Sequence, residues 1–171
     1  MAEFRPAYEK MIRNEGGYVN HKVAGDRGGQ TYAGIARTFH GDWKGWNLID
    51  RDDMDNPELT ELVIEFYKSK FWDKVKGDEI QNQRIAATIF DFSVNTGTRT
   101  ASKLLQLVVG ETPDGIIGPK TVAAVNQADE ELFVAKYALA KVARYAEIVK
   151  RDRSQIKFLL GWLNRTLGEI S

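Results

Sequence analysis

The stretch "RIAATIFDFSVNTG", residues 84–97, is apolar around almost its whole helical circumference. Such a helix is expected at the centre of a domain, where neighbouring elements cover every face. Asn95 and Gly97 are typical of a helix C-terminus, so the helix is predicted to end there. Asp91 lies inside it and needs a polar partner if it is buried. The stretch therefore predicts the buried central helix of a mainly α protein, with Asp91 in a structural role.

The segments on either side have the three-and-four spacing of amphipathic helices. Apolar residues from Phe4 to Ile12 form one stripe, which Gly16 and Gly17 should stop. Between residues 18 and 34, glycines and polar residues show no helical period, which predicts a small β-hairpin or loop region. Further helices are predicted from Pro57 to about Phe71, from a cap at Thr98 or Thr100, from Pro119, from Asp129, and over residues 155–167.

The chain of 171 residues is long enough to bury a core and contains no low-complexity tract, repeat or Ser/Pro linker. We therefore predict one compact helical bundle in two parts, residues 1–97 and 98–171, packed together as a unit.

The composition argues against several function classes. Lys plus Arg and Asp plus Glu number 24 each, so the zero net charge does not favour nucleic acid as a partner. No segment approaches the roughly 18 apolar residues of a membrane span, and the N-terminus lacks the apolar core of a signal peptide. Two histidines and no cysteine offer no zinc motif. We expect a protein made in the cytoplasm, without membrane insertion, metal or cofactor.

The first helix ends on a carboxylate. Glu15 lies four residues after Met11 and three after Ile12, so it continues the inward-facing stripe. Apolar neighbours and the negative end of the helix dipole should both raise the pKa of this carboxyl group. A general acid that works near neutral pH needs such a raised pKa. The alternative is a glutamate that only solvates the end of a helix.

A second carboxylate, Asp26, lies in the glycine-rich segment and should be hydrated and ionised. An acid paired with an ionised carboxylate is the arrangement of glycoside hydrolysis. Thr31 offers a hydroxyl that could hold a water molecule, and Gly29 lets the backbone approach a sugar ring closely. Tyr18 and Tyr32 flank this segment and could stack on sugars or could pack locally. Asp26 could equally be an ordinary turn residue.

Five segments, in order along nearly the whole chain, resemble glycoside hydrolase family 108. This lysozyme-like group is often labelled secretion activator proteins and carries a C-terminal type 3 peptidoglycan-binding part. The segments are "NEGGYVNHKVAGDRGGQTYAGI", "FYKSKFWDKV", "IAATIFDFSVNTGTRTASKLLQ", "DGIIGPKTVAAVN" and "FLLGWLNR". The resemblance implies an α+β lysozyme-like fold and an N-acetylmuramidase that cleaves the β-1,4 bond between N-acetylmuramic acid and N-acetylglucosamine in bacterial peptidoglycan.

The resemblance also implies roles for individual residues. The family's Glu-Gly-Gly-Tyr falls on residues 15–18, which makes Glu15 the inferred acid. The order of Glu15, Asp26 and Thr31 is similar to that of phage endolysins, with a slightly longer gap between the two carboxylates. Relatives commonly have a carboxylate where this chain has Gln30, so no ionised role is assigned there. Asn95 matches an asparagine near the cleft of lysozyme-like proteins, and a helix cap is its alternative role.

Two other functions remain open from the sequence. A lytic transglycosylase also needs one acid, but the 6-hydroxyl group of the substrate closes the ring and 1,6-anhydro sugars result. A wall-binding or secretion-assisting protein would need no catalytic residue at all. In each case the place of action is the cell wall, in the periplasm or outside the cell.

Overall fold

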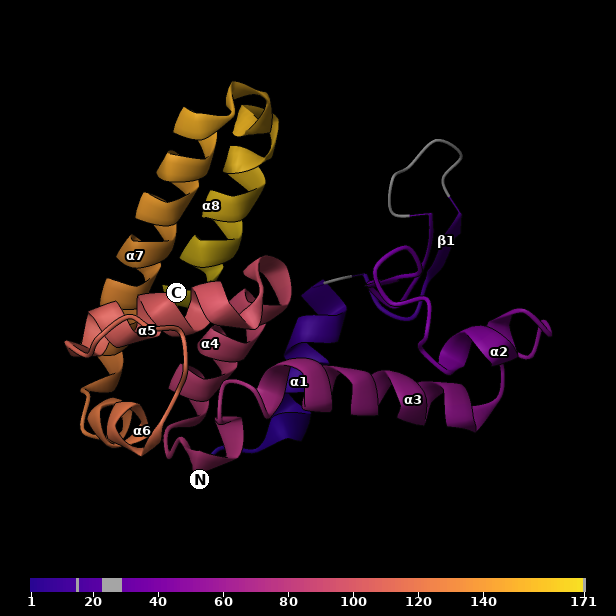
Figure 1. Ribbon diagram of the computed structural model, residues 1–171, viewed down its shortest axis with the longest axis horizontal. Helices are drawn as coiled ribbons and strands as arrows, with labels where there is room; N and C mark the ends of the chain where they lie inside the picture. Colours follow the sequence, from indigo (N-terminus) through magenta and orange to yellow (C-terminus); the bar gives the residue numbers. More distant parts are fainter. Residues whose placement is uncertain (15, 23–28, 171) are drawn as a thin grey trace.

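The computed structural model describes residues 1–14, 16–22 and 29–170. Figure 1 shows a helical region formed by α4 to α8 at one end and a small sheet with α2 at the other, with α1 and α3 between them. The elements are α1 Phe4–Asn14, β1 Asn20–Lys22, β2 Gln30–Tyr32, β3 Ile35–Ala36, α2 Gly45–Ile49, α3 Pro57–Tyr67, a π-helical turn Lys68–Trp72, a 3-10 turn Gly77–Glu79, α4 Gln83–Thr96, α5 Thr98–Val109, α6 Pro119–Asn126, α7 Glu130–Arg151, a 3-10 turn Arg153–Gln155 and α8 Ile156–Ile170. The mainly α, lysozyme-like fold class is confirmed.

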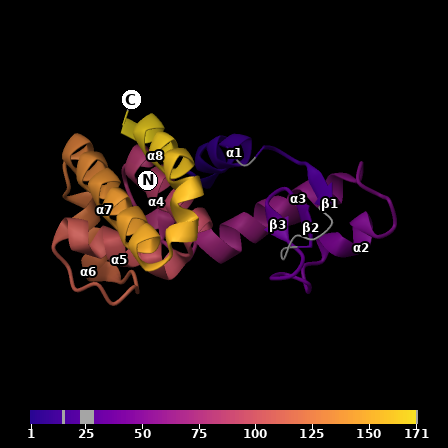
Figure 2. The ribbon, with the colours of Figure 1, turned by 90° about the horizontal axis from the view of Figure 1, so that it is seen from above.

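Helix α4 is the central helix that its sequence predicts. The side chain of Asn82 caps its start by accepting a hydrogen bond from the Ile85 N–H at 3.0 Å. Ile89 and Phe90 are fully buried. The ring of Phe90 packs against Phe4 of α1 at 5.8 Å. In Figure 2, α4 lies behind α7 and α8, and α1 lies to its right. The apolar surface of α4 is thus covered by helices from both halves of the chain.

The start of α1 is fastened to the start of α4. The N–H of Ala2 donates to the Ile80 carbonyl at 2.7 Å, and Gln83 exchanges two hydrogen bonds with the backbone of Glu3. Both helices run in the same direction from this point (Figure 1). Their C-terminal ends therefore lie on the same side of the molecule.

Two glycines terminate α1. The N–H of Gly16 donates to the Arg13 carbonyl at 3.2 Å, and the N–H of Gly17 donates to the Ile12 carbonyl at 2.8 Å. Both glycines have positive φ, a conformation that costs other residues free energy. This pair of hydrogen bonds forms a Schellman motif, which satisfies carbonyls at the end of the helix and turns the chain toward the sheet.

The sheet is a three-stranded antiparallel meander in the order β1-β2-β3. Tyr67 of α3 is buried, and its hydroxyl donates to the carbonyl of Ala33 at 2.8 Å. The predicted small β region is confirmed, and this hydrogen bond attaches it to α3.

Two element boundaries differ from the sequence expectation. Helix α3 ends at Tyr67 and continues as the π-helical turn Lys68–Trp72, whereas an uninterrupted helix to about Phe71 was expected. Helix α5 begins directly after Gly97, which is its N-cap and supplies no side chain, so neither Thr98 nor Thr100 is the cap. The positive φ of Gly97 allows α4 and α5 to follow each other without a linker.

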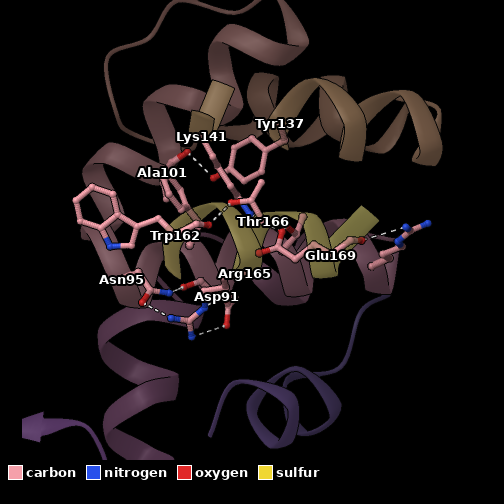
Figure 3. Close-up of polar contacts among 12 residues, drawn as sticks. Asp91, Asn95, Ala101, Tyr137, Lys141, Trp162, Arg165, Thr166 and Glu169 are labelled. Carbon is pink, nitrogen blue, oxygen red and sulfur yellow. Dashed lines mark hydrogen bonds and ion pairs between the residues drawn. The ribbon is translucent and has the colours of Figure 1, made fainter. Parts of the chain in front are cut away.

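Helices α7 and α8 form a hairpin that is attached to α4 by buried polar contacts (Figure 3). Lys141 of α7 is fully buried and donates to the Thr88 hydroxyl at 3.0 Å and to the carboxylate of Glu169 in α8. The ammonium group also lies 5.0 Å from the centre of the Tyr137 ring. Burial lowers the pKa of Lys141. One lysine therefore joins three helices.

A second polar contact lies nearer the end of α4. The guanidinium of Arg165 in α8 donates to Asp91 at 3.2 Å and to the Asn95 side chain at 2.7 Å (Figure 3). Asp91 thus has the polar partner that its buried position requires. The C-terminal end of α8 is held similarly, because Arg84 donates to the Glu169 carbonyl at 3.1 Å.

Candidate active site

The two predicted catalytic carboxylates, Glu15 and Asp26, lie outside the described residues. The residues next to them in the sequence are described: Asn14 is the last residue of α1, and Gly16 and Gly17 close the helix. The remaining predicted residues lie on the sheet, on the segment that leads to it, and at the end of α4.

Tyr18 follows the glycines and is 42% exposed. Its hydroxyl lies 2.6 Å from the hydroxyl of Tyr8. Tyr8 lies in α1, about one and a half turns before the end of the helix. Tyr8 is 2% exposed, and burial followed by the hydrogen bond with Tyr18 raises the pKa of its phenol well above the usual value. Tyr8 therefore stays neutral and holds the polar end of Tyr18, whose ring remains accessible to a ligand.

Tyr8 is itself held by a wider aromatic cluster. Its ring lies 5.9 Å from that of Tyr67, whose hydroxyl bonds to Ala33 next to Tyr32. The exposed tyrosine is thus connected through Tyr8 and Tyr67 to both α3 and the sheet. The sequence offered no signal for this connection, because Tyr8 reads only as a core residue of an amphipathic helix.

Thr31 is the central residue of β2. It is paired with His21 of β1 and with Ala36 of β3, and it is half-buried. Tyr32 is 6% exposed, and its ring stacks on Trp43 at 6.3 Å. Burial raises the pKa of Tyr32. In this structure most of the Tyr32 ring contributes to packing, while Thr31 keeps part of its surface open.

Gly29 precedes β2 and has a φ of +64°. A Cβ atom at this position would lie 3.2 Å from the Thr38 hydroxyl. The backbone conformation and the close approach both favour glycine here. Gly29 therefore has a structural reason to be glycine, in addition to the predicted contact with a sugar.

A polar chain that the sequence did not reveal supports the sheet from the side of α2. Arg37 donates to the Gln30 side chain at 3.0 Å and makes two hydrogen bonds of 2.7 Å to the carboxylate of Asp50. Its guanidinium also lies 5.1 Å from the Trp46 ring centre. Gln30 thus serves as a neutral acceptor for Arg37 beside Thr31.

Asn95 lies near the C-terminal end of α4, away from the sheet residues in the sequence. Its amide donates to the Asp91 carbonyl at 2.7 Å, and its side-chain oxygen accepts from Arg165. The C-cap of α4 is Gly97. Asn95 is exposed, so it can face a ligand while it is oriented by α8.

A groove of about 1150 Å³ lies between α1, α4 and α8. We call it the α1/α4/α8 groove. Its wall includes Lys10 and Asn14 of α1, Asp91 of α4, and Gly161 and Asn164 of α8. Asn14 directly precedes Glu15 in the sequence, so one end of the groove lies where the chain continues into the predicted acid. The sequence did not predict this groove.

Within the described part of the chain, no helix has the length and apolar character to cross a membrane.

Comparison with known families places these features in a protein class. Residues 8–97 match the family Glycosyl hydrolase 108, and residues 100–167 match the "Predicted Peptidoglycan domain". The first match spans more than half of the chain, and the chain belongs to glycosyl hydrolase family 108. The two matches together support a role in hydrolysing or binding cell-wall peptidoglycan.

One solved structure is similar over almost the whole chain. It is that of Brucella abortus SagA, with a TM-score of 0.73 and 29% sequence identity over 98% of this chain and 91% of that one. A search of curated protein sequences finds no match.

Proposed function

We propose that the protein is a peptidoglycan muramidase in which Glu15 is the general acid. The observation that carries the proposal is the Glu-Gly-Gly-Tyr segment at the end of α1 in a chain of glycosyl hydrolase family 108. Gly16 and Gly17 end the helix directly after Glu15, and Tyr18 presents its ring to solvent while Tyr8 holds its hydroxyl. An acid beside an accessible aromatic ring suits a sugar substrate.

In the proposed reaction, Glu15 donates its proton to the oxygen of the β-1,4 bond between N-acetylmuramic acid and N-acetylglucosamine. The bond from the muramic acid C1 to this oxygen breaks, and C1 gains positive character. Asp26 stabilises that charge or, with Thr31, orients a water molecule that attacks C1. The water oxygen forms the new bond to C1, and the Asp26 carboxylate accepts the proton that the water loses. Direct attack by water gives net inversion at C1.

Tyr18, Gly29, Tyr32 and Asn95 are the proposed substrate-binding residues. Tyr18 is the best supported of them, because its exposed ring is held by the Tyr8 hydroxyl. For Tyr32, with its ring stacked on Trp43, the remaining exposed edge would be the part that meets a sugar.

We further propose that residues 1–97 form the catalytic part and that residues 98–171 form a helical part that assists wall binding. The buried contacts of Lys141 and Arg165 with α4 support the view that the two parts act as one rigid unit.

The proposal is tested by measuring the reducing ends released from purified peptidoglycan. Glu15→Gln removes the acid with little change in volume and should lower the rate by at least about 100-fold. Glu9→Gln is the matched control, because Glu9 lies on α1 and its ion pair with Arg5 is exposed to solvent. We expect the control to keep wild-type activity. A folded Glu15→Gln protein with wild-type turnover would exclude Glu15 as the acid.

A further inference from the structure

The α1/α4/α8 groove has no assigned role in the proposed reaction, although it reaches the end of α1. Its length follows α1 and α4, from Gln83 and Arg84 at the start of α4 to Asn14 at the end of α1. A volume of about 1150 Å³ exceeds what a single sugar ring fills. The groove therefore reaches the residue that directly precedes Glu15 in the sequence.

The groove wall presents exposed amides and an exposed cation. Asn14 and Asn164 are exposed amides on opposite walls, from α1 and α8. Lys10 is exposed and forms no ion pair within the described part of the chain. The acids of the wall are engaged: Asp91 pairs with Arg165, and Glu169 pairs with the buried Lys141 (Figure 3). The remaining acid, Glu130, pairs with Arg84 of the same wall. Among the described residues of the wall, Lys10 is thus the charged group without an ion pair.

Helix α8 contributes two glycines to this wall. Gly161 and Gly168 lie two turns apart in the middle and last part of the helix, and both line the groove. A Cβ atom at either position would meet nothing within 4 Å, so packing does not require glycine. Glycine inside a helix costs about 0.5–1 kcal/mol relative to alanine. Their effect in the structure is to leave these two positions of the wall without a side chain.

We propose that the α1/α4/α8 groove binds the peptide stem of peptidoglycan, which is attached to the muramic acid at the cleaved bond. The proposal rests on the proposed function. A stem peptide carries backbone N–H and C=O groups along its length, which match the amides of Asn14 and Asn164. It also carries carboxylates, which match Lys10. A glycan strand would instead favour exposed aromatic rings, whereas the ring of Trp162 in the groove already packs against Phe158 and Tyr145.

The first test compares two substrates that share one glycan: intact peptidoglycan strands, and the same strands after an amidase has removed the stems. Lys10→Gln should lower kcat/KM on intact strands by about tenfold, the effect of losing one charge-assisted hydrogen bond. Its kcat/KM on stripped strands should stay at the wild-type value. Arg13→Gln is the matched control, since Arg13 is exposed on the same helix and does not line the groove. It should leave the preference for intact strands unchanged.

The second test fills the groove without disturbing the fold. Gly161→Phe places a ring in the open space of the groove. Gly161→Ala is the control: it also removes a helical glycine, which stabilises the helix, but it adds only a methyl group. We expect Gly161→Phe to be folded, to lose the preference for intact strands, and to cleave stripped strands normally. Gly161→Ala should behave as wild type. An equal loss of kcat/KM on both substrates would assign the groove to the glycan. If Lys10→Gln and Gly161→Phe both keep the wild-type preference for intact strands, the groove has no ligand. Either result overturns the proposal.

A binding measurement separates this inference from the proposed reaction. Calorimetric titration of the Glu15→Gln protein with a soluble muramyl peptide should show binding. Adding Gly161→Phe to this protein should abolish that binding. The disaccharide without a stem should not bind in the same way. If wild type releases no sugar from either substrate, the muramidase assignment fails, and this titration still decides the groove. Equal binding of the muramyl peptide by the Gly161→Phe protein would contradict the stem site.

Discussion

The hydroxyls of Tyr8 and Tyr18 lie 2.6 Å apart, and this hydrogen bond joins a buried residue of α1 to an exposed residue of the proposed site. Tyr18 stands next to the glycines that end α1, in a segment without regular secondary structure. The hydrogen bond with Tyr8 therefore fixes where the Tyr18 side chain points. It explains how a tyrosine that is 42% exposed can hold one orientation.

Tyr8→Phe removes this hydrogen bond and keeps the ring in the core. We expect a loss of stability of about 1 kcal/mol and a rise in KM, because Tyr18 loses its partner. Tyr18→Phe removes the same bond from the other side. The KM of the Tyr8→Phe/Tyr18→Phe double variant should then be no higher than the larger KM of the two single variants. Fully additive effects on KM would show that the two hydroxyls act independently.

Stability should fall at alkaline pH. Burial raises the pKa of Tyr8 and of Tyr137 above the ordinary value of 10.0. Above pH 10 the unfolded chain loses these protons while the native state keeps them, so the free energy of unfolding decreases as the pH rises. The slope is about 1.4 kcal/mol per pH unit for each such tyrosine. The stabilisation is fully present below pH 10.

Urea denaturation between pH 8 and pH 11 measures this slope. Tyr8→Phe removes one of the titrating groups, so the decrease above pH 10 should become less steep in that variant. An identical slope in wild type and Tyr8→Phe would mean that Tyr8 titrates alike in the folded and unfolded states.

Lys141→Met should destabilise the protein strongly. It leaves the Glu169 carboxylate, whose side chain is 12% exposed, without its cationic partner. Breaking a buried pair in this way costs about 3–5 kcal/mol. The Lys141→Met/Glu169→Leu double variant should recover much of that loss, because no unpaired charge remains. Lys150→Met, at an exposed position of α7, is the control and should change stability by less than about 0.5 kcal/mol. Chemical denaturation of wild type and the three variants measures these free energies of unfolding. Equal losses of stability in Lys141→Met and in the double variant would contradict the prediction.

Gly77→Ala tests the packing around the buried Trp72. An added Cβ atom would lie 2.2 Å from the ring of Trp72, which is fully buried and donates its Nε1–H to Asp78 at 2.7 Å. We expect a loss of about 1–3 kcal/mol from overpacking. Gly161→Ala is the contrasting substitution, because nothing lies within 4 Å there, and it should raise the melting temperature. A gain in stability for both variants would show that Trp72 can move aside.

The sequence was sufficient for features that depend on near neighbours in the chain. The central helix is apparent because residues 84–97 are apolar on nearly every face, and the end of α1 because Gly16 and Gly17 interrupt a periodic stripe. The small β region between residues 18 and 34 followed from the absence of any helical period.

Features that depend on distant residues were not predictable in this way. Lys141 reads as a surface residue of an amphipathic helix, and only Thr88 and Glu169, which come from two other helices, make its burial possible. The α1/α4/α8 groove arises for the same reason, since its walls come from residues about 150 positions apart, such as Lys10 and Gly161. Two glycines in a helical pattern read as weak helix positions until the groove beside them is known.

The central claim is that the protein hydrolyses the muramic acid bond with Glu15 as the acid, and product analysis tests it most directly. Purified peptidoglycan is incubated with wild type and with Glu15→Gln, both shown to be folded, and the soluble products are identified by mass spectrometry. The account predicts disaccharide-peptides with a reducing muramic acid end from wild type and none from Glu15→Gln. Products with 1,6-anhydro muramic acid, or no release by either protein, would contradict it.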